Sequence, residues 1–278
     1  MKKKSALAYP YIIWSGLFIV IPLILVVFFS FTIEVDGKKI LSFANYKELI
    51  DPIYFKVFFR SITLAGISTF ICLLIGYPVA YIITKAPISK RGTLILLFIL
   101  PMWMNFLLRT YAWITLLGKN GIINSLLGMI GIEPISILYT NGAILLGMVY
   151  NFLPFMVLPI YTSLSKMDQD LVNAARDLGA NSLQVFTKVT FPLSLPGVIS
   201  GITMVFMPAV TTFAISRLLG GGKFMLIGDL IEQQFTVVGD WNFGSAVSIF
   251  MMIVILISMA VMSKFEDESD KEGGGLLF

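Results

Sequence analysis

The residues that could react with a ligand are few, and their types exclude most enzyme chemistry. The 278-residue chain has no histidine, which removes the commonest metal ligand and the usual general base near neutral pH. Its single cysteine, Cys72, can form no disulfide within the chain. GGGK at 220–223 resembles a phosphate-binding loop, but Phe224 stands where that motif requires Ser or Thr. The sequence therefore predicts no catalytic site, no metal site and no bound nucleotide or other cofactor on this chain.

The carboxylates and aromatic rings of the chain are suited to binding a cationic ligand. Stripping water from an ammonium group requires carboxylates or aromatic faces around it. Three acids and a tryptophan precede the last apolar segment, namely Asp229, Glu232, Asp240 and Trp241. Within or beside the apolar segments the candidates are aromatic, namely Trp103, Tyr111, Trp113, Tyr150 and Phe213. The alternative for each residue alone is an ordinary role, as a lipid-facing or core ring or as a solvated loop charge.

Arg109 indicates the opposite kind of ligand. It lies inside an apolar segment, where a charge is costly and usually functional. A cation there would repel an ammonium ligand and suit an oxyanion such as sulfate. In the structural alternative, Arg109 pairs with a carboxylate of an outer loop or with carbonyl groups of another helix.

Composition places these residues in a lipid bilayer. The chain is 57% hydrophobic and 13% charged, with a mean hydropathy of +0.90, so no single soluble core could bury its apolar surface. Six apolar segments can each cross about 30 Å of hydrocarbon: Tyr9–Phe31, Phe59–Thr84, Thr93–Leu117, Ala143–Ser163, Pro196–Arg217 and Phe243–Ser263. We expect the first to remain as a membrane anchor. The sequence predicts an all-α membrane protein with one domain, residues 1–265, and a flexible acidic and glycine-rich tail, 266–278.

The cationic residues predict the orientation of these spans. Cytoplasmic segments usually retain more Lys and Arg. The three lysines at 2–4 and the short loop with Lys85, Lys90 and Arg91 would then share the cytoplasmic side. Six spans return the C-terminus to that side. We therefore expect a multi-pass cell-membrane protein with both termini, and the loop 168–192, in the cytoplasm.

That loop is predicted to be a helical hairpin. Asp168 can cap a first helix, and Gly179 supplies the left-handed residue that ends it. A second helix begins near Asn181, carries Phe186 and is ended by Pro192. A polar hairpin between two spans either rests on lipid headgroups or docks on a cytosolic partner, and its spacing favours docking.

The hairpin resembles the EAA loop of ABC-importer permeases. The family pattern is Glu-Ala-Ala, three residues, Gly, nine residues, Ile, one residue and Leu-Pro; NAARDLG and VTFP match it at Ala174, Ala175, Gly179 and Pro192. Asn173 replaces the glutamate, which keeps the polarity and loses the charge. The resemblance implies a type I ABC importer permease fold. It also implies that the residues coupling the chain to an ATPase are Asn173, Ala174, Ala175, Arg176, Gly179, Phe186 and Pro192.

Further stretches resemble the PotB-type permeases of spermidine/putrescine importers. They are NYKELIDPIYFKVFFRSI, LPMWMNFLLRTYAW, YNFLPFMVLPIY, and GGGKFMLIGDLIEQQF followed by DWNFGSA. The resemblance implies a heteromeric importer in the lipid membrane, with no nucleic acid among its ligands. Its other members would be a second homologous permease, a pair of ATPase subunits that bind ATP and Mg, and an extracytoplasmic polyamine-binding protein.

Three alternatives follow from the same residues. Arg109 favours an oxyanion importer of the same architecture. The hairpin alone would also suit a membrane scaffold that recruits a cytosolic partner without transport. An intramembrane enzyme is disfavoured, because the chain has no histidine and no Asp or Glu within its predicted spans.

Two further features have open interpretations. GVISG at 197–201 allows close helix approach, either within the chain or against a second permease. Pro154, Pro159 and Pro208 either kink their helices for packing or mark broken helices that line a transport path.

Overall fold

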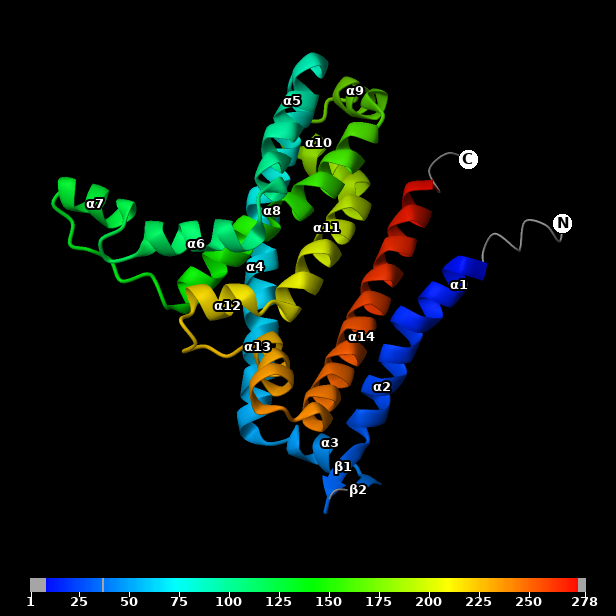
Figure 1. Cartoon of the computed structure of the whole chain (residues 1–278). Coiled ribbons are helices and arrows are strands. Elements are labelled where there is room, and N and C mark those ends of the chain that lie inside the picture. Colours follow the sequence, from blue (N-terminus) through cyan, green and yellow to red (C-terminus); the bar gives the residue numbers. More distant parts are fainter. Residues whose placement is uncertain (1–8, 37, 275–278) are drawn as a thin grey trace.

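The computed structural model describes residues 9–36 and 38–274 and consists mostly of helices (Figure 1). The first half contains α1 (Tyr9–Ser15), η2 (Gly16–Val20), α2 (Ile21–Ser30), β1 (Thr32–Val35), β2 (Lys38–Leu41), α3 (Ala44–Glu48), α4 (Pro52–Lys85), α5 (Ile88–Ile99), η3 (Leu100–Trp103), α6 (Phe106–Leu117) and α7 (Ile122–Met129). The second half contains α8 (Asn141–Lys166), α9 (Gln169–Asp177), α10 (Ser182–Val185), η4 (Phe186–Thr190), α11 (Phe191–Thr211), α12 (Ala214–Leu219), α13 (Ile227–Gln233), η5 (Gln234–Val238) and α14 (Trp241–Gly274).

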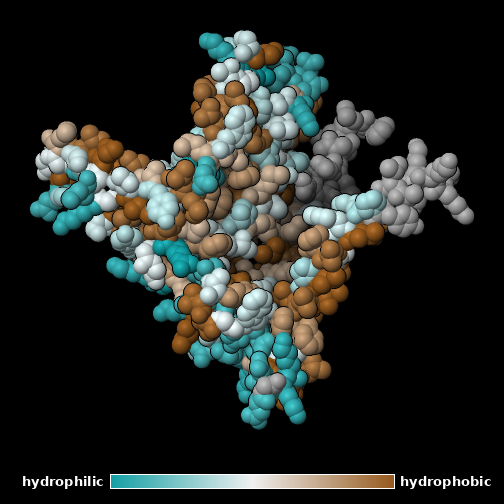
Figure 2. All heavy atoms as spheres, viewed as in Figure 1, coloured by the Kyte–Doolittle hydropathy of each residue, from teal (hydrophilic) through white to brown (hydrophobic). Residues whose placement is uncertain are grey.

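Five helices of the described residues are long and apolar enough to cross a membrane, and a bent pair can supply a sixth span. The five are Pro10–Ser30, Pro52–Lys85, Asn141–Lys166, Ser182–Thr211 and Trp241–Lys264. Figure 2 shows hydrophilic side chains gathered at the two ends of the bundle, whereas hydrophobic side chains cover α2. This distribution fits a protein whose middle lies in hydrocarbon.

The third predicted span is not one straight helix. Ile88–Trp103 and Phe106–Met129 meet at 89°. Between them Met104 is extended, and the Asn105 side chain caps α6 by accepting hydrogen bonds from the backbone N–H groups of Leu107 and Leu108. A capping residue marks the start of a new helix, which can run in a different direction from the one before it. Hydropathy averaged over a segment does not detect such a residue.

The fifth predicted span, Pro196–Arg217, is also interrupted. Its helix ends at Thr211 and a separate helix, α12, restarts at Ala214, with Phe213 between them. Pro208 lies one turn before this break. The short helices α6 and α12 that follow the two breaks contact each other and α8.

The core is a three-helix contact of α4, α8 and α11. It contains fully buried Met156, Ile160 and Val205. Small residues of the GVISG stretch let α11 approach α8 closely: a Cβ on Gly197 would lie 2.5 Å from Ser163 Cβ and 2.7 Å from the Pro159 carbonyl oxygen. The close approach is therefore made within the chain.

This contact predicts a stability effect. We expect Gly197→Leu to push α11 from α8 and lower the free energy of unfolding by about 1–3 kcal/mol. Gly66→Leu is the matched control, because a Cβ on this helical glycine meets nothing within 4 Å. Thermal unfolding of the purified protein measures both variants. An equal Tm for the two would contradict the close packing.

The N-terminal helix packs on α14, and a small hairpin of β1 and β2 connects it to α3 (Figure 1). This antiparallel hairpin is the one departure from the all-α prediction in the described ranges. Its cause is visible in the sequence, since Asp-Gly at 36–37 is a strong two-residue turn signal and Asp36 has a φ of 52°.

The helix α14 continues through Gly274 and so includes residues 266–274 of the predicted tail. Glu and Lys are good helix formers and can extend the last span into water. Residues 275–278 of the predicted tail, like Lys2–Lys4 of the orientation argument, lie outside the described residues.

Candidate functional site

The predicted hairpin is present, and its first helix ends as expected. The Asp168 side chain caps α9 by accepting a 2.9 Å hydrogen bond from the Asp170 N–H. Gly179 has a φ of +82°. The Gly179 N–H donates to the Arg176 carbonyl at 2.9 Å, and the Ala180 N–H donates to the Ala175 carbonyl at 3.0 Å. This pair of bonds is a Schellman motif, which requires the left-handed residue at its centre.

The second arm of the hairpin differs from the prediction. It starts with a capping box, in which Asn181 and Gln184 exchange 2.9 Å hydrogen bonds between side chain and backbone. It does not end at Pro192, however, because Ser182–Thr211 is one continuous helix. The π turn η4 precedes Pro192. A turn of this type shifts the pattern of backbone hydrogen bonds, so the helix can continue although Pro192 has no N–H to donate. The hairpin arm and the membrane helix therefore form one unit.

Three apolar side chains of the hairpin are partly or fully buried. Val172 and Val185 are buried. The Phe186 ring lies edge-on to Tyr77 of α4, with centroids 5.7 Å apart, and also contacts Tyr81. Phe186 therefore anchors the hairpin to α4 rather than facing outward. The burial of the two valines was not predicted, although isolated apolar residues in a polar loop are a usable sign of it.

The outward surface of the hairpin is apolar at its tip. Leu178 is 89% exposed and Leu183 is 71% exposed. The residues of the family motif, Asn173, Ala174, Arg176, Gly179 and Pro192, are also exposed, and Ala175 is half-buried. Exposed leucines on a hairpin with capped helices form an apolar surface that loses its water easily. We call Leu178 and Leu183 the leucine tip.

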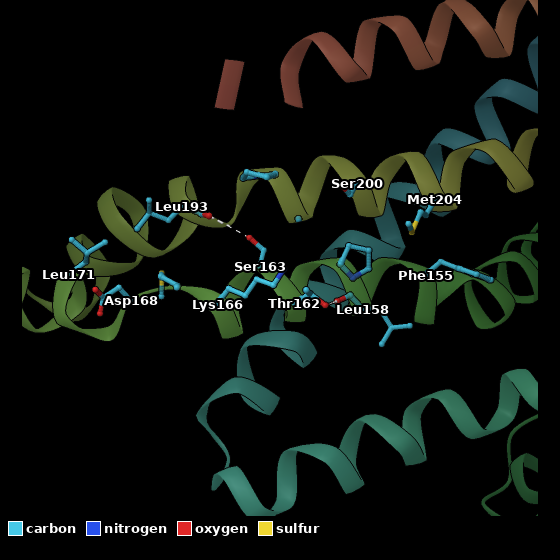
Figure 3. Close-up of a pocket in the computed structure, with 14 residues that line it drawn as sticks. Phe155, Leu158, Thr162, Ser163, Lys166, Asp168, Leu171, Leu193, Ser200 and Met204 are labelled. Carbon is cyan, nitrogen blue, oxygen red and sulfur yellow. Dashed lines mark hydrogen bonds between the residues drawn. The ribbon is translucent and has the colours of Figure 1, made fainter. Parts of the chain in front are cut away.

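A groove of about 760 Å³ begins beside the hairpin and runs between α8 and α11 (Figure 3). Lys166 and Asp168 lie at its hairpin end, and Phe155 and Met204 at the other. The hydroxyl of Ser163 faces the groove and hydrogen-bonds the Leu193 carbonyl at 3.5 Å. The groove combines an apolar wall with a few hydroxyl groups and one charge of each sign.

Two of the aromatic path candidates, Trp103 and Phe213, lie beside the two helix breaks. Trp103 ends η3 at the bend and is 76% exposed, and Tyr111 of α6 is exposed as well. Trp113 and Tyr150 contact each other edge-on, with centroids 5.3 Å apart, and so join α6 to α8. Phe213 is exposed at the break before α12. The structure thus brings Trp113 and Tyr150 together and leaves three other rings available to a ligand or to partner chains.

Arg109 lies on α6, just beyond the bend. Its side chain is buried, and its Nε has no hydrogen-bond partner in the described part of the chain. Within those residues the single ion pair is that of Arg217 and Glu232. The alternative in which Arg109 pairs with an outer-loop carboxylate therefore has no such ion pair among the described residues.

The three acidic candidates occupy two separate pockets. Asp229 and Glu232 of α13 line a cavity of about 300 Å³, in which Glu232 is paired with Arg217 at 2.8 Å. Asp229 accepts hydrogen bonds from the Ser216 hydroxyl and the Leu226 N–H, so it caps α13. Burial raises the pKa of the Asp229 carboxyl, and those two hydrogen bonds oppose the shift.

The third acid belongs to a cavity of about 600 Å³ between the β-hairpin and the start of α14. The Asp240 carboxylate accepts hydrogen bonds from the N–H groups of Asn242 and Phe243 and so caps α14. Trp241 is exposed and contacts Phe29. Lys39 places its ammonium 4.3 Å from the centre of the Phe29 ring. Because a lysine of the chain already uses this ring, an incoming ammonium group would compete with it.

The capping role of Asp229 predicts different effects for two substitutions. We expect Asp229→Asn to retain transport, because an amide oxygen can accept the same two hydrogen bonds from Ser216 and Leu226. Asp229→Ala should cost about 1–2 kcal/mol of stability through the lost cap. Thermal unfolding and uptake by the reconstituted complex measure both. A stable Asn variant without uptake would instead assign the charge to cargo binding.

Comparison with known proteins places this geometry in a family. Residues 2–267 match the family described as binding-protein-dependent transport system inner membrane component. The chain is 41% identical over 253 residues to the spermidine/putrescine transport system permease protein PotB of Escherichia coli (strain K12), covering 89% of this chain and 92% of that protein. It is 42% identical over 254 residues to the protein of the same name from Haemophilus influenzae, with coverages of 89% and 88%.

A solved structure shares the fold of this chain. The crystal structure of a bacterial ABC transporter involved in the import of the acidic polysaccharide alginate has a chain with a TM-score of 0.81 and 17% identity, covering 95% of this chain and 94% of that one. At such low identity the likeness concerns the fold, which is that of type I ABC importer permeases. The chain belongs to the family of binding-protein-dependent transport system inner membrane components.

Proposed function

We propose that this chain is a permease subunit of an ATP-driven importer that carries polyamines, spermidine or putrescine, across the cell membrane. The observation that carries the proposal is the similarity of about nine-tenths of the chain to spermidine/putrescine permeases at 41–42% identity. The hairpin geometry supports the ATP-driven part, because it presents a rigid apolar tip and is anchored to two long helices.

The proposed complex contains four kinds of protein. This chain pairs with a second homologous permease, and two ATPase subunits bind ATP and Mg and dock on the hairpins. An extracytoplasmic protein binds the polyamine and delivers it to the outer mouth. The hairpin end of the bundle then faces the cytoplasm, with both termini on that side, as the distribution of Lys and Arg predicts.

The force is proposed to travel through the hairpin along two routes. One is the continuous helix from Ser182 to Thr211, which joins the second hairpin arm to the fifth span. The other is the contact of Phe186 with Tyr77, which reaches α4. When ATP closes the two ATPase subunits, a hairpin attached in this way moves both helices and rocks the bundle from inward-facing to outward-facing. Hydrolysis resets the inward-facing state.

The cargo path is proposed to follow the helix breaks. Helices interrupted near the middle of a membrane expose backbone carbonyl groups that can replace water around a cation. Trp103 and Phe213 flank the two breaks and add aromatic faces. Glu232 of the outer mouth can exchange its Arg217 partner for an ammonium group of the cargo. The groove between α8 and α11 is the proposed exit toward the cytoplasm.

An oxyanion importer of the same architecture is the second candidate. The specific observation in its favour is Arg109, which is buried with an unpartnered Nε. The two candidates are separated by the ATPase activity of the reconstituted complex in the presence of loaded binding protein. Stimulation by spermidine or putrescine and not by sulfate supports the polyamine proposal, and the reverse result overturns it. Co-purification of an ATPase and a second permease tests the scaffold alternative, which requires neither.

A further inference from the structure

A second groove lies on the side of the bundle, toward the end opposite the hairpin (Figure 1). It has a volume of about 630 Å³ and runs along α4 beside the start of α8. Its lining residues are Pro52, Phe55, Lys56, Phe59, Arg60, Thr63, Leu64, Ile67, Asn141 and Leu145. Those from α4 recur at helical spacing and therefore form one face of that helix. The face is apolar apart from Thr63 and two cations.

The length of the groove matches one leaflet of a bilayer. From Lys56 to Ile67 the helix rises by about 16 Å. The hydrocarbon of one leaflet is about 15 Å thick, half of the bilayer core. Phe59 is 63% exposed and Ile67 is 42% exposed, and both lie within a helix that can span the membrane. The apolar part of the groove, from Phe59 to Ile67, is about 12 Å long and can therefore hold most of one acyl chain.

The head of the groove carries uncompensated positive charge. Lys56 and Arg60 lie one helical turn apart, and no carboxylate lines the groove. Neither cation forms an ion pair within the described ranges. The nearest acid in sequence, Asp51, uses its carboxylate to cap α4 by accepting from the Ile53 N–H at 2.9 Å. The Arg60 guanidinium lies 5.4 Å from the centre of the Phe224 ring, a contact that orients it and leaves its charge in place.

We propose that this groove binds an anionic phospholipid in the leaflet opposite the hairpin. The lipid phosphate lies between Lys56 and Arg60, and one acyl chain follows Phe59, Thr63 and Ile67 along α4. A single molecule then supplies both the negative charge at the head and the apolar chain along the groove. An apolar helix of a partner chain would fill the channel but leave two cations without a counter-charge, which is costly beside hydrocarbon.

The test uses the complete importer, purified with its partner chains and offered phosphatidylglycerol or phosphatidylcholine with identical acyl chains. Native mass spectrometry measures the lipid that each complex retains. We expect wild type to retain phosphatidylglycerol preferentially and K56Q/R60Q to retain about tenfold less. The matched control K38Q/K47Q removes two exposed cations outside this groove and should retain as much as wild type. Equal retention by K56Q/R60Q and wild type would overturn the proposal.

A second measurement covers the case in which K56Q/R60Q fails to assemble. A photo-crosslinking amino acid at Thr63 of the complex in native membranes should give a phospholipid adduct, because Thr63 lies in the groove. Thr63→Trp, which fills the channel and keeps both cations, should lower phosphatidylglycerol retention. A polypeptide adduct at this position, or full retention by Thr63→Trp, would contradict the proposed occupant.

Discussion

Replacing Gly179 by valine should uncouple ATP hydrolysis from transport. At a φ of +82° a side chain costs about 1–2 kcal/mol, and a β-branched side chain costs more. The Schellman bonds to the Arg176 and Ala175 carbonyls would then be lost, and the second arm of the hairpin would leave its present angle. We expect ATP-driven uptake in reconstituted vesicles to fall by about tenfold or more, since each 1.4 kcal/mol of lost coupling corresponds to a factor of ten.

Two further variants separate this effect from general loss of stability. Gly131→Val introduces the same strain elsewhere, since Gly131 has a φ of +79° and, like Gly179, nothing within 4 Å of an added Cβ. It should retain uptake. Gly179→Asn should also retain most uptake, because asparagine tolerates the left-handed conformation. Unchanged uptake by Gly179→Val, or equal losses in the valine variants of both glycines, would contradict the coupling role of the hairpin.

Changing the leucine tip to aspartate should detach the ATPase. Leu178 and Leu183 are the most exposed apolar side chains of the hairpin and contribute little to the packing of this chain. Burying an unpaired carboxylate in an apolar contact costs several kcal/mol, so Leu178→Asp/Leu183→Asp should lower the affinity for the ATPase by about a hundredfold or more. The ATPase that co-purifies with the tagged permease measures this loss.

The matched control places the same change on another exposed leucine. Leu126 of α7 is 57% exposed and distant in sequence from the hairpin. Leu126→Asp should therefore leave the ATPase attached. Full recovery of the ATPase with the leucine-tip variant would show that the hairpin docks through other residues.

The elements that could be predicted from the sequence are those with local signals. Asp168, Gly179 and Asn181 act on residues within a few positions, so the caps and the turn of the hairpin were correctly predicted. The long apolar spans were found for the same reason, because hydropathy is summed over one continuous segment.

The predictions that were wrong concern helix ends, because the same residue can either end a helix or allow it to continue. Pro192 ends many helices, yet here a π turn carries the helix past it. Asn105 caps a new helix inside an apolar segment, and composition alone hides the resulting 89° bend. The contact of Phe186 with Tyr77 could not be predicted either, because the two residues are more than a hundred positions apart in the sequence.

The candidate cargo residues were the hardest to predict, because each carboxylate has a local use. Asp229 and Asp240 cap the helices that follow them, and Glu232 pairs with Arg217. The positions of acidic residues in the sequence do not show which of them cap helices and which could bind a ligand. The distinction needs the hydrogen-bond partners that only the folded chain supplies.

The central claim is that this chain carries polyamines under the control of ATP, and uptake by the complete reconstituted importer tests it most directly. Vesicles that contain the permease pair and the ATPase, supplied with binding protein and internal ATP, should accumulate labelled spermidine or putrescine. Accumulation should require ATP and should persist in excess sulfate. ATP-dependent accumulation of sulfate, or no ATP-dependent accumulation of either polyamine, would contradict the account.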